Sequence, residues 1–219
     1  MTGAIAVTGD DTQGGRMRKN TLAAAVAIGV VGSVAAILLT PPDQKLGAMV
    51  RFVMYHGAST WVNMVTFTIA GAAGVATLLG ANGWQRYGEA FRWLALPHWV
   101  VNTILGLISM KLIWGGVLWN EPRLLMTFAV LAGALVVLAA QFLVDSPKAP
   151  AALDALLAAT LWVLVLVLPN LFHPDSPVFR SGNTVYIATF LGMVASIAIA
   201  VLTAGVAIAR RGRTTEAAA

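Results

Sequence analysis

The sequence contains no cysteine, few charged residues and no recognisable enzyme motif. Without cysteine the chain forms no disulfide, binds no metal through thiolates and attaches no haem covalently through its own side chains. Charged residues make up 11% of the chain, whereas a soluble domain normally carries about a quarter. A nucleotide-binding glycine loop, an HExxH motif and a nucleophile–base pair are all missing, so we expect the chain not to be an enzyme.

Apolar residues dominate the chain and come in long blocks. They make up 58% of it, and blocks of about 20 apolar residues match the thickness of a bilayer core. The alternating pattern of a barrel strand is absent, which leaves helices as the spanning elements. We predict an all-α integral membrane protein with six transmembrane helices, at 21–40, 59–80, 94–113, 124–144, 153–172 and 184–209.

The predicted spans divide the chain into three parts and set its orientation. Residues 1–20 and 210–219 are expected to be cytoplasmic tails, the first of them disordered, around a transmembrane domain at 21–209. Most of the 14 lysines and arginines lie on the side of the termini, and the positive-inside rule then places both termini in the cytoplasm. The basic residues form no aromatic-interleaved face, so we expect no nucleic-acid partner. We predict a multi-pass protein of a bacterial or archaeal plasma membrane, in contact with lipid.

Two of the three histidines lie at the predicted outer boundary. His56 belongs to the expected outer loop 41–58, and His173 follows the fifth span. Neutral imidazole is a good axial ligand for haem iron. The middle outer loop, WGGVLWNEPRLL, offers Trp114 and Trp119 as an aromatic shelf for a porphyrin. Its Arg123 is suited to pairing with a propionate, as is Arg51 of the first outer loop.

This middle loop resembles the tryptophan-rich outer loop of the cytochrome c assembly proteins, a haem-handling family, and of haem exporter protein C in particular. Trp114 and Gly115 match the opening of that loop, and Glu121 falls on an acidic residue of the family. Arg123 and Leu124 match its closing Arg-Leu pair.

Two further stretches extend the resemblance. MYHGASTW, at 54–61, is similar to the family's YIHVPSAW, and PNLFHPDSPVF, at 169–179, occupies the place of its second outer histidine. Order and topology agree over roughly residues 50–185. The resemblance implies non-covalent haem b at the outer face, with His56 and His173 as the two iron ligands. It implies delivery of haem to a chaperone for c-type cytochrome maturation, beside the subunits of an ABC transporter. The full set of implied cofactor-binding residues is His56, His173, Trp114, Trp119, Glu121 and Arg123.

Two other functions stay open at this point. The loop has only two tryptophans, fewer than the family usually carries, which favours a b-type haem subunit that retains its haem for electron transfer in a respiratory complex. A transporter or scaffold without haem is the third hypothesis. It rests on the ordinary behaviour of these residue types, because histidines and tryptophans also gather at bilayer interfaces for packing alone.

The remaining polar residues of the spans have structural interpretations. His98 follows Pro97 near the cytoplasmic end of the third span, an axial drop of about 20 Å below the outer loop. We therefore expect that it cannot share a haem with His56 and that it is a core or interfacial histidine. Asn63 and Asn102 are expected to hydrogen-bond between helices.

Overall fold

The described part of the chain is entirely helical. The computed structural model describes the backbone of residues 10–81, 83–169, 171–172 and 177–216, and the side chains of those between 20 and 211. Six helices there are long and apolar enough to cross a membrane, which confirms a multi-pass membrane protein. The helices are α1 (Asp10–Leu39), α2 (Val50–Leu78), α3 (Gln85–Trp114), α4 (Pro122–Leu143), α5 (Lys148–Val167), the short α6 (Pro177–Arg180) and α7 (Thr184–Glu216).

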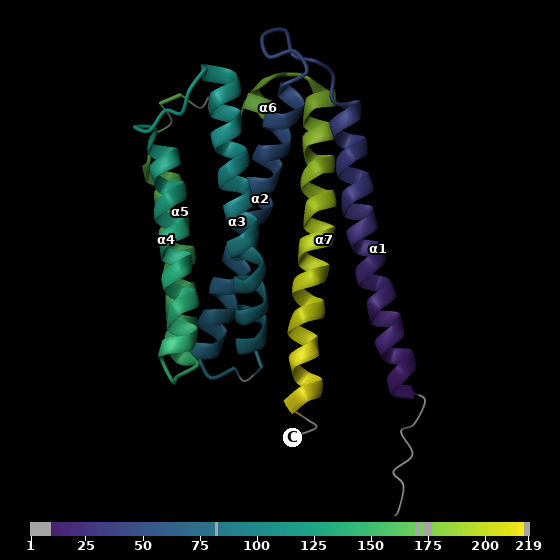
Figure 1. Ribbon diagram of the computed structural model, residues 1–219, viewed down its shortest axis with the longest axis vertical. Coiled ribbons are helices and arrows are strands. Elements are labelled where there is room, and N and C mark those ends of the chain that lie inside the picture. The colour runs from purple at the N-terminus through teal and green to yellow at the C-terminus, as the bar shows by residue number, and fades with distance from the viewer. Residues whose placement is uncertain (1–9, 82, 170, 173–176, 217–219) are drawn as a thin grey trace, which may run out of the picture.

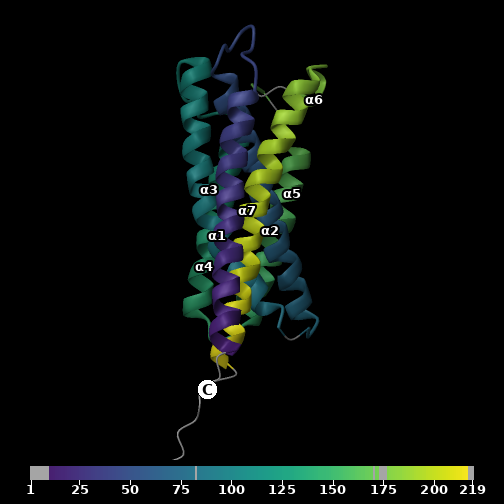
Figure 2. The same cartoon turned by 90° about the vertical axis from the view of Figure 1, so that its right-hand side faces the viewer.

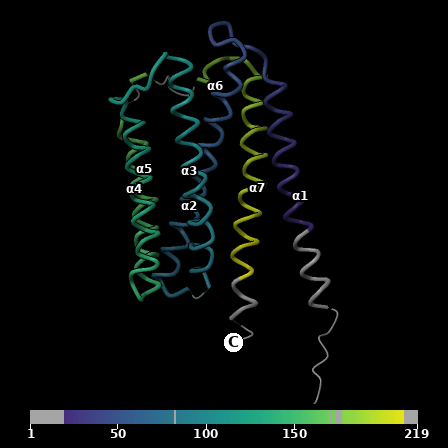
Figure 3. Tube along the Cα trace, viewed as in Figure 1, coloured from purple at the N-terminus to yellow at the C-terminus, as the bar shows by residue number. Residues whose placement is uncertain are grey.

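The helices run up and down, so that the connections fall into two groups (Figures 1 and 3). Connections 40–49 and 115–121 and the described residues of 168–183 lie at one end, which we call the tryptophan-loop end. Connections 79–84 and 144–147 lie at the other, where α1 begins and α7 ends, and which we call the termini end. The start of α1 and the end of α7 therefore lie on one side of the bundle, as an even number of spans requires.

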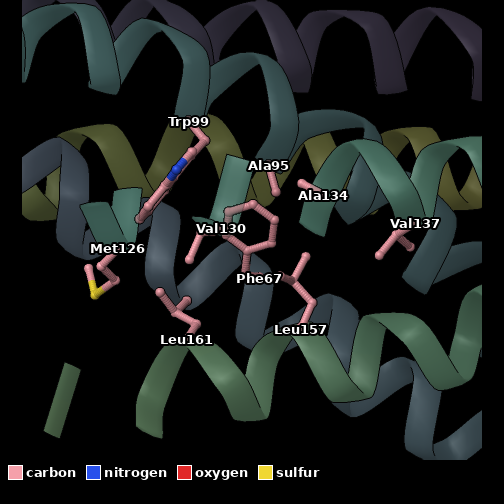
Figure 4. Packing of buried hydrophobic residues seen from close by; sticks show 9 residues of the cluster. All are labelled: Phe67, Ala95, Trp99, Met126, Val130, Ala134, Val137, Leu157 and Leu161. Atoms are coloured by element: carbon pink, nitrogen blue, oxygen red, sulfur yellow. The ribbon is translucent and has the colours of Figure 1, made fainter. Parts of the chain in front are cut away.

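One hydrophobic core lies among α2, α3, α4 and α5 (Figure 4). Trp99 of α3 is 1% exposed and packs edge-on against Phe67 of α2, with ring centroids 5.5 Å apart. The Trp99 indole N–H donates to the carbonyl of Thr127 in α4 at 2.9 Å, so the polar edge of a buried ring is also satisfied. The rest of this core consists of Ala95, Met126, Val130, Ala134, Val137, Leu157 and Leu161.

A second core joins α2 to the pair formed by α1 and α7. Met54 and Val62 of α2 pack there with Phe190 and Met193 of α7. Figure 2 shows α1 and α7 running together along one flank of the molecule. Because α2 contributes to both cores, it is the element that attaches the α1–α7 pair to the other four helices.

Small residues let α2 and α5 approach closely at the termini end. A Cβ added to Gly74 would collide with the carbonyl oxygen of Ala151, and one added to Gly71 would collide with Ala158. Close backbone contact of this kind is a main source of helix association in lipid, where no hydrophobic effect drives the helices together.

The predicted spans are confirmed as helices, but several bounds are wrong. α2 begins at Val50, because Pro41, Pro42 and Gly47 are the breaking residues of this region and nothing between Val50 and His56 interrupts a helix. α5 ends at Val167 rather than at 172, since Leu168 precedes Pro169 and a residue before proline avoids helical angles.

Helical structure extends into both expected tails. α1 already begins at Asp10, inside the stretch 1–20 predicted to be disordered, and α7 continues to Glu216 beyond the predicted end at 209. Extending an existing helix by one residue is far easier than nucleating a new helix. Polar residues next to a stable span therefore join its helix.

α5 is shorter than α2 at the tryptophan-loop end. The Trp162 indole N–H donates to the hydroxyl of Thr68 at 2.9 Å, which fixes the level at which α5 and α2 meet. From there α5 continues only to Val167, whereas α2 continues back to Val50. At 1.5 Å per residue, α2 extends roughly 20 Å further than α5 at this end. The part of α2 that carries His56 therefore lies beyond the end of α5.

Candidate functional site

His56 lies in the second turn of α2 and not in a loop, which corrects the prediction that placed it in 41–58. Its side chain is half-buried and faces α3. Gly106 of α3 makes room for the ring, because a Cβ at that position would lie 3.1 Å from the imidazole Cε1 and 3.3 Å from Nε2. Trp114 ends α3 eight residues after Gly106, so His56 lies about 12 Å below the start of the tryptophan loop.

Hydrogen bonds among Thr60, Asn102 and His56 set the tautomer of the neutral His56 ring. The Thr60 hydroxyl donates its proton to the carbonyl of His56 at 3.0 Å. The Thr60 oxygen can therefore only accept a hydrogen bond from Asn102. The Asn102 amide group donates to that oxygen at 2.9 Å, which turns the amide oxygen toward His56 Nδ1 at 3.1 Å. An amide oxygen only accepts, so Nδ1 carries the proton and Nε2 carries the lone pair. A histidine that donates one ring N–H in this way has the arrangement typical of a metal ligand.

His98 lies close to this set, contrary to the prediction from axial distance. It occupies the middle of α3, and its Nε2 lies 2.9 Å from the hydroxyl of Ser59. Ser59 is one turn from His56 on α2, and Asn102 is one turn from His98 on α3, so the two histidines differ in level by about one turn. The large separation followed from treating His56 as a loop residue. His98 is nevertheless the interhelical core histidine that we expected.

Asn63 continues the polar contact between α2 and α3. In the amide orientation that satisfies both groups, its nitrogen donates to the carbonyl of Ala95 at 3.2 Å and its oxygen accepts from the Trp99 N–H at 2.7 Å. These backbone groups flank Pro97, which cannot donate and disturbs the helical ladder around it. The side chain thus bridges α3 where proline weakens it. The prediction that Asn63 and Asn102 bond between helices is confirmed.

The middle connection carries the other residues implied by the resemblance. Trp114 is the last residue of α3 and is half-buried, while Trp119 is 62% exposed and stacks on Phe128 of α4, with ring centroids 6.4 Å apart. Arg123 is the second residue of α4 and is half-buried. Arg51, an alternative propionate partner, donates from Nε to the carbonyl of Thr40 at 2.7 Å and so caps the end of α1.

Glu121 is the most buried of the implied residues. It is 0% exposed and immediately precedes α4, yet its side chain does not cap that helix. Its Oε2 instead accepts the backbone N–H of Phe172 at 3.2 Å. The middle connection and the connection that follows α5 therefore meet at this residue, which the sequence alone could not establish.

His173 lies outside the described residues, so its predicted role is carried forward as a prediction. The described residues on either side of it are informative. Leu168 packs against the four-helix core, and Val178 of α6 packs against the core that contains Met54. Phe179 stacks on Trp61 of α2 with ring centroids 5.7 Å apart. The described structure resumes at α6 beside the tryptophan-loop half of α2.

The sequence interpretation missed a charged network at the termini end. Arg92 of α3 forms a bidentate ion pair with the carboxylate of Asp154 of α5, through Nε at 3.1 Å and Nη2 at 2.5 Å. Both side chains are buried. Arg92 Nη1 donates to Gln141 of α4 at 2.7 Å, and Gln141 in turn donates to Glu89 at 2.8 Å. The sequence signal was Asp154, the one acidic residue of α5, because an ionisable residue in a span requires a partner.

These four residues line a cavity among α2, α3, α4 and α5, together with Gly74, Thr77, Gln85, Gly88, Pro147, Pro150 and Ala151. The cavity belongs to the polar network at the termini end, and the side chains of that network already contact one another.

Compared with known proteins, the sequence matches no family model and no curated protein.

Proposed function

We propose that the chain binds haem at its tryptophan-loop end, with His56 as one iron ligand. The observation that carries the proposal is the fixed state of the His56 ring. Asn102 accepts a hydrogen bond from the Nδ1–H, so the lone pair of the neutral ring lies on Nε2. Thr60 and Asn102 thus orient the ring and set its tautomer, as the hydrogen-bond partner of a metal-bound histidine does.

His173 is the proposed second ligand. Its support is that Val178 and Phe179, which follow it in the sequence, pack beside Met54 and Trp61 in the half of α2 that carries His56. Two imidazoles would give iron a low-spin, six-coordinate site. Trp114 and Trp119 are proposed to contact the porphyrin, and Arg123 to pair with a propionate.

The proposed role of this site is haem delivery for c-type cytochrome maturation. The tryptophan-loop end would face outward and both termini the cytoplasm of a bacterium or archaeon, as the distribution of basic residues favours. ABC transporter subunits and a haem chaperone are the proposed partners. Exposure of Trp119 at the surface of this end suits a site from which haem is passed on.

One observation favours the alternative, in which haem is retained by a b-type electron-transfer subunit. His56 belongs to a helix and is hydrogen-bonded to a second helix, an environment more rigid than the loop that we expected. A rigid ligand suits permanent binding better than release.

Absorption spectroscopy of the purified protein tests the proposal. Wild type, His56→Ala, His173→Ala and His98→Ala are supplied with haem in detergent and measured oxidised and reduced. We expect a low-spin spectrum that survives loss of His98 and is lost with either of the other histidines. A wild-type protein that takes up no haem, or a spectrum unchanged in the His56 and His173 variants, contradicts the proposal. Transfer of bound haem to an apo-chaperone separates delivery from retention.

A further inference from the structure

Glu121 is buried at a place where a loop carboxylate would ordinarily face water. It is 0% exposed, although Asn120 beside it is exposed. It stands directly before α4, where an acidic side chain usually binds the first free N–H groups of the helix, but it forms no such bond. Its carboxylate is directed to another part of the chain, the backbone of Phe172.

Burial of a carboxylate is costly unless hydrogen bonds compensate for the lost water. The Phe172 N–H supplies such a bond to Oε2 at 3.2 Å, and hydrogen bonds to charged acceptors are stronger than those between neutral groups. The same bond joins two connections that are far apart in the sequence, 115–121 and 168–176. Its position, one residue before His173, makes it the attachment point of the segment that carries the second proposed ligand.

We propose that Glu121 is a positioning residue that holds the Phe172 segment against the tryptophan loop. This differs from the role implied by the family resemblance, in which Glu121 belongs to the cofactor-binding set. Here it acts through the backbone of the neighbouring connection and does not itself touch haem. The part of the proposal that concerns haem rests on the proposed function, whereas the attachment of the two connections does not.

Spin labels measure the attachment without haem. Because the chain has no cysteine, Asn120→Cys and Leu171→Cys introduce two unique and exposed labelling sites beside the bond. We expect a narrow distance distribution in the otherwise unchanged protein and in Glu121→Gln, whose amide oxygen can still accept the N–H. Glu121→Leu cannot accept the Phe172 N–H and should broaden the distance distribution. Glu121→Asp keeps the charge but loses reach, and should broaden it to an intermediate degree.

The Asp and Gln variants keep the test decisive if the Leu variant does not fold. A distribution that stays narrow in the Leu and Asp variants overturns the attachment. Glu89→Leu makes the same substitution at the termini end and serves as the matched control. It should leave the distance between the two labels unchanged.

Haem titration of the same variants, without labels, tests the positioning role. We expect Glu121→Leu to bind haem at least tenfold more weakly and to show a larger high-spin fraction, with Gln restoring the low-spin spectrum. Equal affinity and equal spectra in all variants overturn the positioning role even where the labels move. Absence of haem binding by the wild type would refute the proposed function, while the label distances would still decide whether Glu121 joins the two connections.

Discussion

The two ends of the bundle use polar residues in different ways. At the termini end, Arg92, Asp154, Gln141 and Glu89 bond to one another and tie α3, α4 and α5 together. Toward the tryptophan-loop end, the polar side chains that bond between α2 and α3 are two histidines, amides and hydroxyls. Charged side chains thus join three helices at the termini end. Neutral side chains between α2 and α3 instead set the orientation and tautomer of the His56 ring.

The largest expected effect comes from breaking the charged end. Either Arg92→Leu or Asp154→Leu leaves a buried charge without its partner, and we expect a loss of about 3–5 kcal/mol in the free energy of unfolding. Unfolding by sodium dodecyl sulfate in mixed micelles measures it. The double variant removes both charges and should recover more than half of the loss. If the double variant is as unstable as the sum of the two single variants, the ion pair does not close this end.

The next effect concerns the orientation of His56. Asn102→Leu removes the acceptor of the Nδ1 proton, and loss of such a partner typically weakens metal binding by about 10–100-fold. Haem titration measures this affinity.

Asn102→Asp sharpens the same comparison, because it brings a charge to the neutral contact between α2 and α3. A carboxylate draws the Nδ1 proton more strongly and makes Nε2 a more basic ligand, which stabilises ferric iron. The reduction potential of bound haem should therefore fall, as a redox titration would show. A potential that rises or stays constant would mean that Asn102 does not act on the ligand through Nδ1.

A smaller effect is expected at Asn63. Asn63→Leu leaves the Ala95 carbonyl and the Trp99 N–H without the bridging amide, and we expect a loss of about 1–2 kcal/mol. In a Pro97→Ala background the helical ladder can close by itself, so the same substitution should cost less. Equal cost in the two backgrounds, measured by the unfolding assay above, would show that Asn63 does not compensate for the proline.

The smallest effect is expected at Trp162, which lies between the two ends. Trp162→Phe removes one hydrogen bond to Thr68, and single interhelical bonds in membranes average about 0.6 kcal/mol. Thr68→Val should cause a similar loss, and the double variant should add nothing further. Additive losses would show that the bond between α2 and α5 contributes no stability.

The comparison of the two ends also explains which features the sequence could predict. The spans were predictable because hydropathy depends on composition over about 20 residues, and Asn63 and Asn102 were predictable because lone amides in spans seek partners. His56 was misplaced because a polar residue near a span boundary has no local signal that separates a loop from a helical turn. The Arg92–Asp154 pair was missed because it depends on α3 and α5 being neighbours, which no local pattern in the sequence specifies.

The short length of α5 has a consequence for access to His56. A helix of 20 residues is about 30 Å long, which equals the hydrocarbon thickness of a bilayer. If lipid adjusts to α5, the longer α2 extends past the acyl chains, and His56 lies about 10 Å beyond the end of α5, at the depth of the headgroups. An amphipathic ligand with acidic side groups would then reach this imidazole sideways from the membrane surface, with its charges never leaving water.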